Sequence, residues 1–100
     1  MKLITYARNG LTHLGALFGE SVAEFDSPAT MRELISAEPA VLSSLVSAIS
    51  AGKLRTYPMA DVHLLAPLPN PSKIVGIGLN YLDHCKEAKL PVPARPLVFA

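Results

Sequence analysis

The sequence predicts an α+β fold, in which short strands and two helices form a first domain and a further strand and helix follow. Three observations lead to this prediction. Apolar residues alternate near the N-terminus, they recur at helical spacing between residues 31 and 49, and a proline-rich stretch then precedes another apolar run. We therefore expect a small N-terminal domain over residues 1–68 and a second domain over residues 69–100.

The first elements are expected to be antiparallel strands. Lys2–Tyr6 is rich in β-branched and aromatic residues, which favour strands. The following dipeptide Asn9-Gly10 tolerates positive φ at both positions, and this favours a tight hairpin turn. Leu11–Phe18 is the expected second strand and Val22–Phe25 the third. The first domain should therefore contain three to four short strands.

Two helices are expected next. Thr30 and Glu33 match a capping box, in which the threonine accepts a hydrogen bond from a free N–H and the glutamate reaches back. Pro39 suits the first turn of the second helix, where its missing N–H costs nothing. An apolar stripe follows at helical spacing, made of Val41, Leu42, Leu45, Val46 and Ile49. Both helices are therefore expected to cover one side of the strands.

The remaining chain begins with prolines that recur from Tyr57 to Ser72 and indicate an extended, stiff segment. Val62–Ala66 is a candidate strand within it. Lys73–Ile77 is a short continuous apolar run, which is typical of a buried strand. A short helix is expected over Tyr81–Lys89, and Leu97–Ala100 is expected to be an exposed apolar strand.

Composition argues against several functional classes. The net charge is +1 and the basic residues are scattered, so nothing indicates nucleic-acid binding. No apolar stretch approaches the roughly 20 residues of a membrane span, and no apolar leader precedes Arg8. Cys85 is the only cysteine, which excludes an internal disulfide and fits a reducing compartment. These features predict a soluble cytoplasmic protein.

The candidate chemistry lies in the last thirty residues. His84 and Glu87 are three positions apart on an expected helix and so share a face. A carboxylate beside an imidazole orients the ring and stabilises its protonated form. This is how a general base is prepared to take a proton from water. On spacing alone, an ordinary solvated helix face is the alternative.

Two glycines raise the possibility of a nucleotide site. Gly76 and Gly78 follow a predicted strand, but the third glycine of a dinucleotide loop would fall at Tyr81, and no acidic residue follows at the expected distance. Small residues that let a strand pack closely against its neighbours explain the two glycines better. The three dispersed histidines and the single cysteine have no zinc spacing.

The stretch from Lys73 to Ala100 resembles the segment that opens the catalytic domain of the fumarylacetoacetate hydrolase family. That segment has an apolar strand, the pattern G-x-N-Y-x-x-H-x-x-E and a proline-containing run that ends on Phe. The matching residues here are Gly78, Asn80, Tyr81, His84, Glu87, Leu90, Pro91, Pro96 and Phe99. Residues 1–68 resemble the small N-terminal domain of many bacterial members. Residues 69–100 are then expected to be the first strand and lid helix of a truncated mixed β-roll catalytic domain.

The resemblance implies an enzyme that acts on small diketo or keto acids, by acylpyruvate-like C–C bond hydrolysis, decarboxylation or isomerisation, as in aromatic catabolism. It implies that His84 is the general base, Glu87 its orienting partner, and Asn80 and Tyr81 substrate-binding residues. It also implies a homodimer formed through the catalytic domain. A divalent cation, Mg²⁺ or Mn²⁺, is expected in the full-length enzyme as a Lewis acid, with its ligands outside this chain.

This chain departs from the family pattern in two ways. Leu79 stands where many members have an arginine, so a substrate carboxylate would need another partner. The family's metal carboxylates and a lysine would lie beyond Ala100, so the chain alone is expected to be inactive. The alternative is a non-catalytic folding or interaction module, in which residues 1–68 pack on a catalytic domain or a partner subunit, because half of the residues are apolar and the 100 residues hold no complete site.

Overall fold

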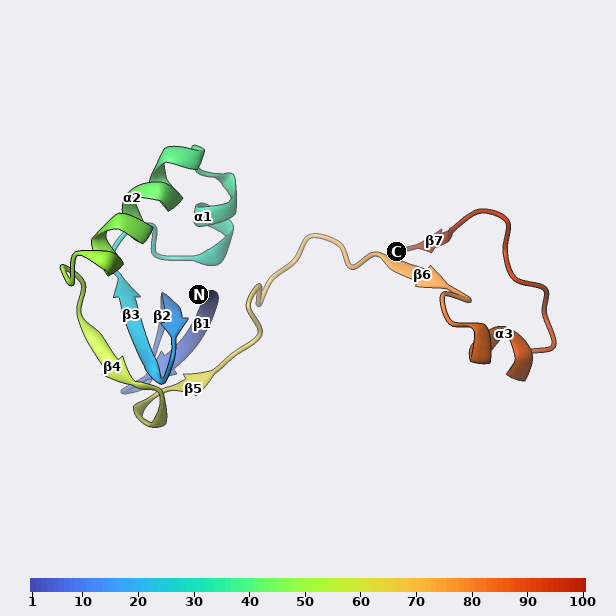
Figure 1. Cartoon of the computed structure of the whole chain (residues 1–100), viewed down its shortest axis with the longest axis horizontal. Helices are drawn as coiled ribbons and strands as arrows, with labels where there is room; N and C mark the ends of the chain where they lie inside the picture. The colour runs from blue at the N-terminus through green and yellow to red at the C-terminus, as the bar shows by residue number, and fades with distance from the viewer. The chain divides into compact units, whose positions relative to one another are not determined.

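The computed structural model describes residues 1–100, which divide into two compact units, Met1–Pro69 and Asn70–Ala100 (Figure 1). The predicted α+β class is confirmed, because an antiparallel sheet is combined with three α-helices. The assignment of the second unit to a larger β-roll stays a prediction. Each unit is described by itself.

The first unit is built on a five-stranded antiparallel sheet with the strand order β4-β3-β2-β1-β5. The hairpin prediction is confirmed, since Asn9 and Gly10 have φ angles of 50° and 76° and join two strands that pair along their whole length. The strands are β1 (Lys2–Arg8), β2 (Leu11–Phe18), β3 (Ser21–Phe25), β4 (Thr56–Pro58) and β5 (His63–Leu64). A 3₁₀ turn, η1 (Met59–Asp61), connects the last two.

Helices α1 (Met31–Ser36) and α2 (Pro39–Ser50) lie together on one side of this sheet (Figure 1). The α1 cap forms as predicted: the Glu33 N–H donates to Thr30 Oγ1 at 3.2 Å, and the Glu33 carboxylate accepts from the Ala29 N–H at 2.9 Å. The predicted α2 stripe is only half buried. Leu42 and Val46 remain 37% and 39% exposed, because a helix on the surface of a small sheet contacts it along one row of side chains.

Alternation along the strands gives the sheet two apolar faces. Residues on β2 and β3 that pair across the strands, such as Leu14 and Phe25, face the helices. The helix-side core consists of Leu14, Ala16, Phe25, Met31, Leu34 and Leu45. The other face carries a second buried cluster, Ile4, Tyr6 and Val22, with Met59 and Val62 packed against it. The sheet is therefore covered on one face by helices and on the other by the short connecting segments.

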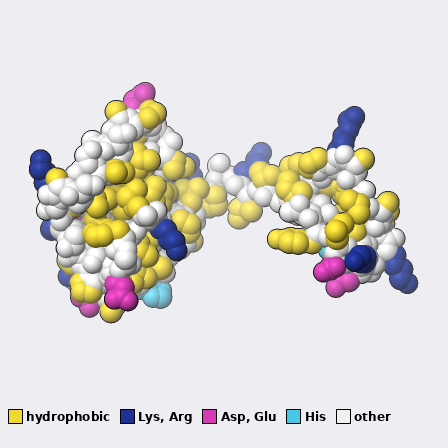
Figure 2. Space-filling view, viewed as in Figure 1, with side chains coloured by type: hydrophobic (Ala, Val, Ile, Leu, Met, Phe, Trp, Pro, Cys, Tyr) yellow, Lys and Arg dark blue, Asp and Glu magenta, His cyan; other side chains and the backbone are white.

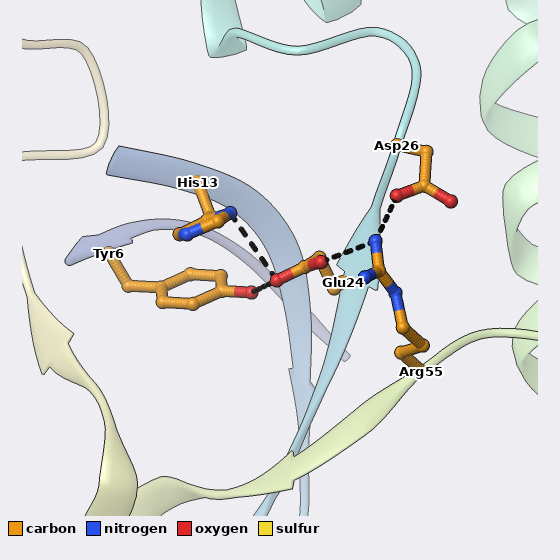
Figure 3. A network of polar contacts seen from close by, with 5 residues as sticks. All are labelled: Tyr6, His13, Glu24, Asp26 and Arg55. Atoms are coloured by element: carbon orange, nitrogen blue, oxygen red, sulfur yellow. Dashed lines mark hydrogen bonds and ion pairs between the residues drawn. The ribbon is translucent and has the colours of Figure 1, made fainter. Parts of the chain in front are cut away.

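A buried carboxylate on the second face belongs to a network with four other polar side chains (Figure 3). Glu24 is only 5% exposed. It accepts a hydrogen bond from Tyr6 Oη at 3.0 Å, lies 3.3 Å from His13 Nδ1 and pairs with Arg55 Nη2 at 2.7 Å. Arg55 also pairs with the exposed Asp26. We call these five residues, Tyr6, His13, Glu24, Asp26 and Arg55, the Glu24 cluster. Sequence reasoning did not predict it.

The Glu24 cluster perturbs the ionisation of its members. Burial raises the pKa of Tyr6 well above its ordinary value, and the hydrogen bond to the Glu24 carboxylate raises it further. The hydrogen bond to Asp26 raises the pKa of Arg55, and the charges of Asp26 and Glu24 add to this. The arrangement thus favours a neutral phenol and a charged guanidinium around one carboxylate.

Gly15 makes this packing possible. A Cβ atom at Gly15 would lie 2.4 Å from the backbone oxygen of Ala23 and 3.2 Å from Tyr6 Cε1. The Tyr6 ring also stacks on His13, with 5.4 Å between the ring centroids. A side chain at position 15 would therefore displace either the backbone of β3 or the aromatic ring.

The second unit has a two-stranded sheet of β6 (Gly76–Gly78) and β7 (Leu97–Phe99), with α3 (Leu82–Glu87) in the loop between them. The prediction of a buried strand over Lys73–Ile77 is wrong: the strand begins at Gly76, and Ile74 and Ile77 are 76% and 43% exposed. A two-stranded sheet has no second layer to cover it. The predicted exposed strand at the end of the chain is confirmed, and Figure 2 shows hydrophobic side chains at the surface of this unit.

No helix in the structure has both the length and the apolar content needed to cross a membrane.

The close approach at Gly15 leads to a prediction about stability. Gly15→Ala should lower the free energy of unfolding by about 1–3 kcal/mol, because the new methyl group meets backbone atoms that have little room to move. Urea denaturation followed by circular dichroism measures the change. Ser47→Ala, on the exposed side of α2, is the control and should change stability by less than about 0.5 kcal/mol. Equal effects of both variants would contradict the packing role.

The raised pKa of Tyr6 leads to a prediction about alkaline pH. Above about pH 10 the unfolded chain releases the phenol proton first, so stability should fall with rising pH, by at most about 1.4 kcal/mol per pH unit from this group. Tyr6→Phe should remove that part of the slope. Tyr81→Phe, at a side chain 75% exposed, should keep it. Denaturation curves at several pH values between 8 and 11 test this, and an unchanged slope in Tyr6→Phe would refute it.

Candidate functional site

All four residues predicted to form the site lie in the second unit, between β6 and β7. Asn80 and Tyr81 are in the turn that leads into α3, and His84 and Glu87 are one helical turn apart on α3. Both α3 side chains are exposed, and no hydrogen bond or ion pair joins them in this structure. Their shared face follows from the helix, while their catalytic role stays a prediction.

Cys85 anchors α3 to the turn before it. It is the buried residue of this helix, at 3% exposed, and its thiol donates a weak hydrogen bond to the carbonyl of Leu79 with Sγ 3.5 Å from the oxygen. Its own carbonyl accepts from the Leu90 N–H at 3.0 Å. Because neighbouring residues on a helix point in different directions, burial of Cys85 leaves His84 facing outward. The cysteine therefore has a structural position and no imidazole partner.

A small open cavity of about 250 Å³ lies beside this turn. Most residues that line it are apolar, and its only side chains with hydrogen-bonding groups are Asn80 and Arg95. The lining residues are Ile77, Gly78, Leu79, Asn80, Val92, Pro93, Ala94, Arg95 and Pro96. Of the predicted site residues, Asn80 lines this cavity and the other three do not. Sequence reasoning did not select Arg95 as a site residue, although it is a single cation within an apolar, proline-rich run.

The carboxylates of the second unit do not form a metal centre. Asp83 Oδ1 lies 3.7 Å from Lys86 Nζ in an exposed ion pair. No group of three Asp, Glu, His or Cys side chains lies close enough together to hold a metal ion. Residues of this chain therefore do not match the oxygen-rich ligand set that Mg²⁺ requires. The predicted Mg²⁺ or Mn²⁺ site, with ligands outside this chain, stays a prediction and enters no step described below.

Packing explains Gly76 without a nucleotide. A Cβ atom at Gly76 would lie 2.6 Å from Cζ of Phe99, whose ring covers the strand. A Cβ atom at Gly78 would be in ordinary contact with Leu97. Packing against the paired strand β7 therefore explains a glycine at position 76, whereas position 78 has room for a Cβ atom.

The first unit offers less for catalysis. The Glu24 cluster does not line the surface hollow of this unit, and Tyr6 within it is completely buried. An open hollow of about 400 Å³ lies between residues 7–10 and 60–63. The Arg8 guanidinium at its wall already stacks on Tyr57, 3.8 Å from the ring centroid. The candidate site is therefore the turn, helix and cavity of the second unit.

Known proteins provide a comparison for this chain. It is 41% identical over 73 residues to the human protein named oxaloacetate tautomerase FAHD2A, mitochondrial, which covers 73% of this chain and 23% of that protein. It is 39% identical over 72 residues to oxaloacetate tautomerase fahd2, mitochondrial, of Xenopus laevis, covering 72% and 22%. The fumarylacetoacetate hydrolase domain-containing protein 2 homolog of Dictyostelium discoideum is 34% identical over 109 aligned positions, covering 100% and 35%. No protein-family model matches the chain.

The prediction of a cytoplasmic protein is wrong, because the human and frog relatives are named as mitochondrial proteins. The prediction used the absence of an apolar leader and the presence of a single cysteine. Mitochondrial targeting segments are amphipathic rather than apolar. Neither feature therefore separates the cytosol from mitochondria.

The Dictyostelium relative is named for the fumarylacetoacetate hydrolase domain, which is the family that the residues from Gly78 to Phe99 resemble. This chain spans between 22% and 35% of the length of the relatives described above. The resemblance to the fumarylacetoacetate hydrolase family is thus confirmed, and the chain is a homologue of the fumarylacetoacetate hydrolase domain-containing proteins.

Proposed function

We propose that the protein is an enzyme of keto acids and that it interconverts the keto and enol forms of oxaloacetate or a closely similar acid. The observation that carries this proposal is the exposed His84 and Glu87 pair on one face of α3, in a chain whose relatives are named oxaloacetate tautomerases. We also propose a mitochondrial location, after the names of these relatives.

Keto–enol interconversion is a pair of proton transfers. The His84 imidazole takes a proton from the carbon next to the ketone, the C–H electron pair forms the C=C bond, and the carbonyl π electrons move to the oxygen, which gains a proton. The Glu87 carboxylate, one helical turn away, stabilises the imidazolium that forms and orients the ring. C–C bond hydrolysis would use the same base on a water molecule, so the exposed pair supports either reaction.

Other parts of the proposal concern residues and partners around this pair. Asn80 and Tyr81 precede α3 directly, and we assign them to substrate binding because their side chains are exposed beside the helix that bears His84. The divalent cation and the homodimer belong to the proposal for the whole protein. Their ligands and contacts would come from outside this chain.

The base role predicts a selective loss of rate. In the full-length protein, His84→Ala should lower kcat by about 10²–10⁴-fold with little change in KM, because a general base contributes to the chemical step. The enol absorbance of oxaloacetate in the ultraviolet provides the assay. Glu87→Gln should produce a smaller loss and change the pH profile of kcat, since it removes the charge that stabilises the imidazolium.

Lys86→Ala is the matched control, because it changes an exposed side chain on the same helix. It should leave kcat nearly unchanged. Turnover by His84→Ala at the wild-type rate would remove His84 from the mechanism.

A second candidate function is the folding or interaction module. It is favoured by β7, which pairs with β6 along one edge only and whose residues Leu97, Val98 and Phe99 are 49%, 64% and 62% exposed. If this surface packs on a catalytic domain, the 100-residue chain should bind a separately prepared catalytic domain in sedimentation experiments, and Val98→Lys should weaken the complex. A well-dispersed monomer with no affinity for that domain would contradict this candidate.

A further inference from the structure

We propose that Arg95, together with Asn80, forms a binding site for the carboxylate of a small keto acid in the cavity of the second unit. The inference rests on the proposed function for the class of ligand. The site itself is carried by the cavity, its lining and its charge. Neither the spacing of the motif nor the relatives' names assign a role to Arg95.

The cavity has the composition of a small-ligand site. Most of its walls are aliphatic or proline side chains, and the two polar side chains come from different segments, Asn80 before α3 and Arg95 before β7. Its volume of about 250 Å³ is below the roughly 300–1,000 Å³ typical of drug-sized ligands. It therefore suits a ligand with few heavy atoms, such as a keto acid of three or four carbons.

Both walls that carry the polar groups are conformationally restricted. Leu79 has a φ of 48°, a left-handed conformation that non-glycine residues rarely adopt, and the Cys85 thiol is hydrogen-bonded to its carbonyl. On the other wall, Arg95 lies in a bend and is followed by Pro96, which disfavours a helical backbone at the arginine. A site with fixed walls loses less entropy when it binds a ligand.

The charge at the cavity favours an anion. Arg95 is exposed and makes no ion pair or hydrogen bond within the chain, whereas Asp83 of the same unit pairs with Lys86. No acidic residue lines the cavity. A guanidinium presents two parallel N–H donors that match the two oxygens of a carboxylate. The Asn80 side-chain amide then offers a donor for a neighbouring ketone oxygen, and α3 with His84 begins two residues later.

The test is a binding titration on the ¹⁵N-labelled 100-residue chain, with pyruvate as the probe and methyl pyruvate as its uncharged counterpart. Pyruvate should shift the Asn80 side-chain amide and the Arg95 Nε–H resonances, and methyl pyruvate should not. Arg95→Gln should raise the dissociation constant for pyruvate at least about tenfold, because it removes a charge-assisted bidentate contact. Arg95→Lys keeps the positive charge but loses the two parallel N–H donors of the guanidinium. Its dissociation constant for pyruvate should therefore lie between those of wild type and Arg95→Gln.

Lys73→Gln is the control, since it removes one positive charge from the same unit outside the cavity. It should leave the dissociation constant within about twofold of wild type. Equal losses in Lys73→Gln and Arg95→Gln, or no shifts with pyruvate up to about 50 mM, would overturn the site.

Kinetics on the full-length enzyme separate this inference from the proposed function. Arg95→Gln should raise KM for oxaloacetate at least about tenfold, while Lys73→Gln leaves it unchanged. An active enzyme whose KM is insensitive to Arg95→Gln would overturn the site and leave the function intact. Pyruvate binding that depends on Arg95, in an enzyme without tautomerase activity, would support the site and overturn the function.

Discussion

The candidate site depends on the pairing of β6 with β7. Three residue pairs, from Gly76 with Phe99 to Gly78 with Leu97, close a loop that contains every residue discussed for catalysis or binding. This ladder brings Asn80 and Arg95, fifteen positions apart in the sequence, to the walls of one cavity. A two-stranded sheet is marginal on its own in water. Gly76 lets the Phe99 ring approach this ladder closely.

The first unit shows how a sheet with two apolar faces is covered in so short a chain. The helices occupy one face, and the other is covered by η1 and its neighbours and by the Glu24 cluster. A carboxylate that is 5% exposed is costly unless its oxygens are satisfied. Tyr6 donates a hydrogen bond to it, Arg55 forms an ion pair with it, and His13 Nδ1 lies 3.3 Å away, each from a different segment. The cluster therefore fixes the register of these strands as well as filling the face.

Sequence reasoning succeeded where a signal is local and failed where it depends on register. The Asn9-Gly10 turn and the Thr30 cap each arise within four residues, so their chemistry can be recognised directly. The Glu24 cluster cannot, because it requires knowing that Glu24 pairs with Gly15 and that Tyr6 is opposite His13. The burial expected for Lys73–Ile77 failed for a related reason: an apolar run implies a buried strand only if other layers cover it.

The same distinction applies to the candidate site. The spacing of His84 and Glu87 was visible because a helix places residues three apart on one face, and α3 forms as predicted in type although it is shorter than expected. The cavity was not visible, since its two polar side chains come from opposite ends of a closed loop. Arg95 stands out in the sequence only as a cation between prolines, which is also typical of an ordinary solvated loop.

The exposure of the second unit bears on how such a site would operate. A base removes a proton from carbon most effectively where water is excluded, because electrostatic interactions are stronger there. His84 is exposed here, and the apolar side chains of Tyr81, Leu82 and Leu90 around its helix are 75%, 64% and 51% exposed. A helix that only faces solvent rarely exposes so much apolar surface, which is more typical of an interaction site. The proposed chemistry would therefore need further protein to cover α3.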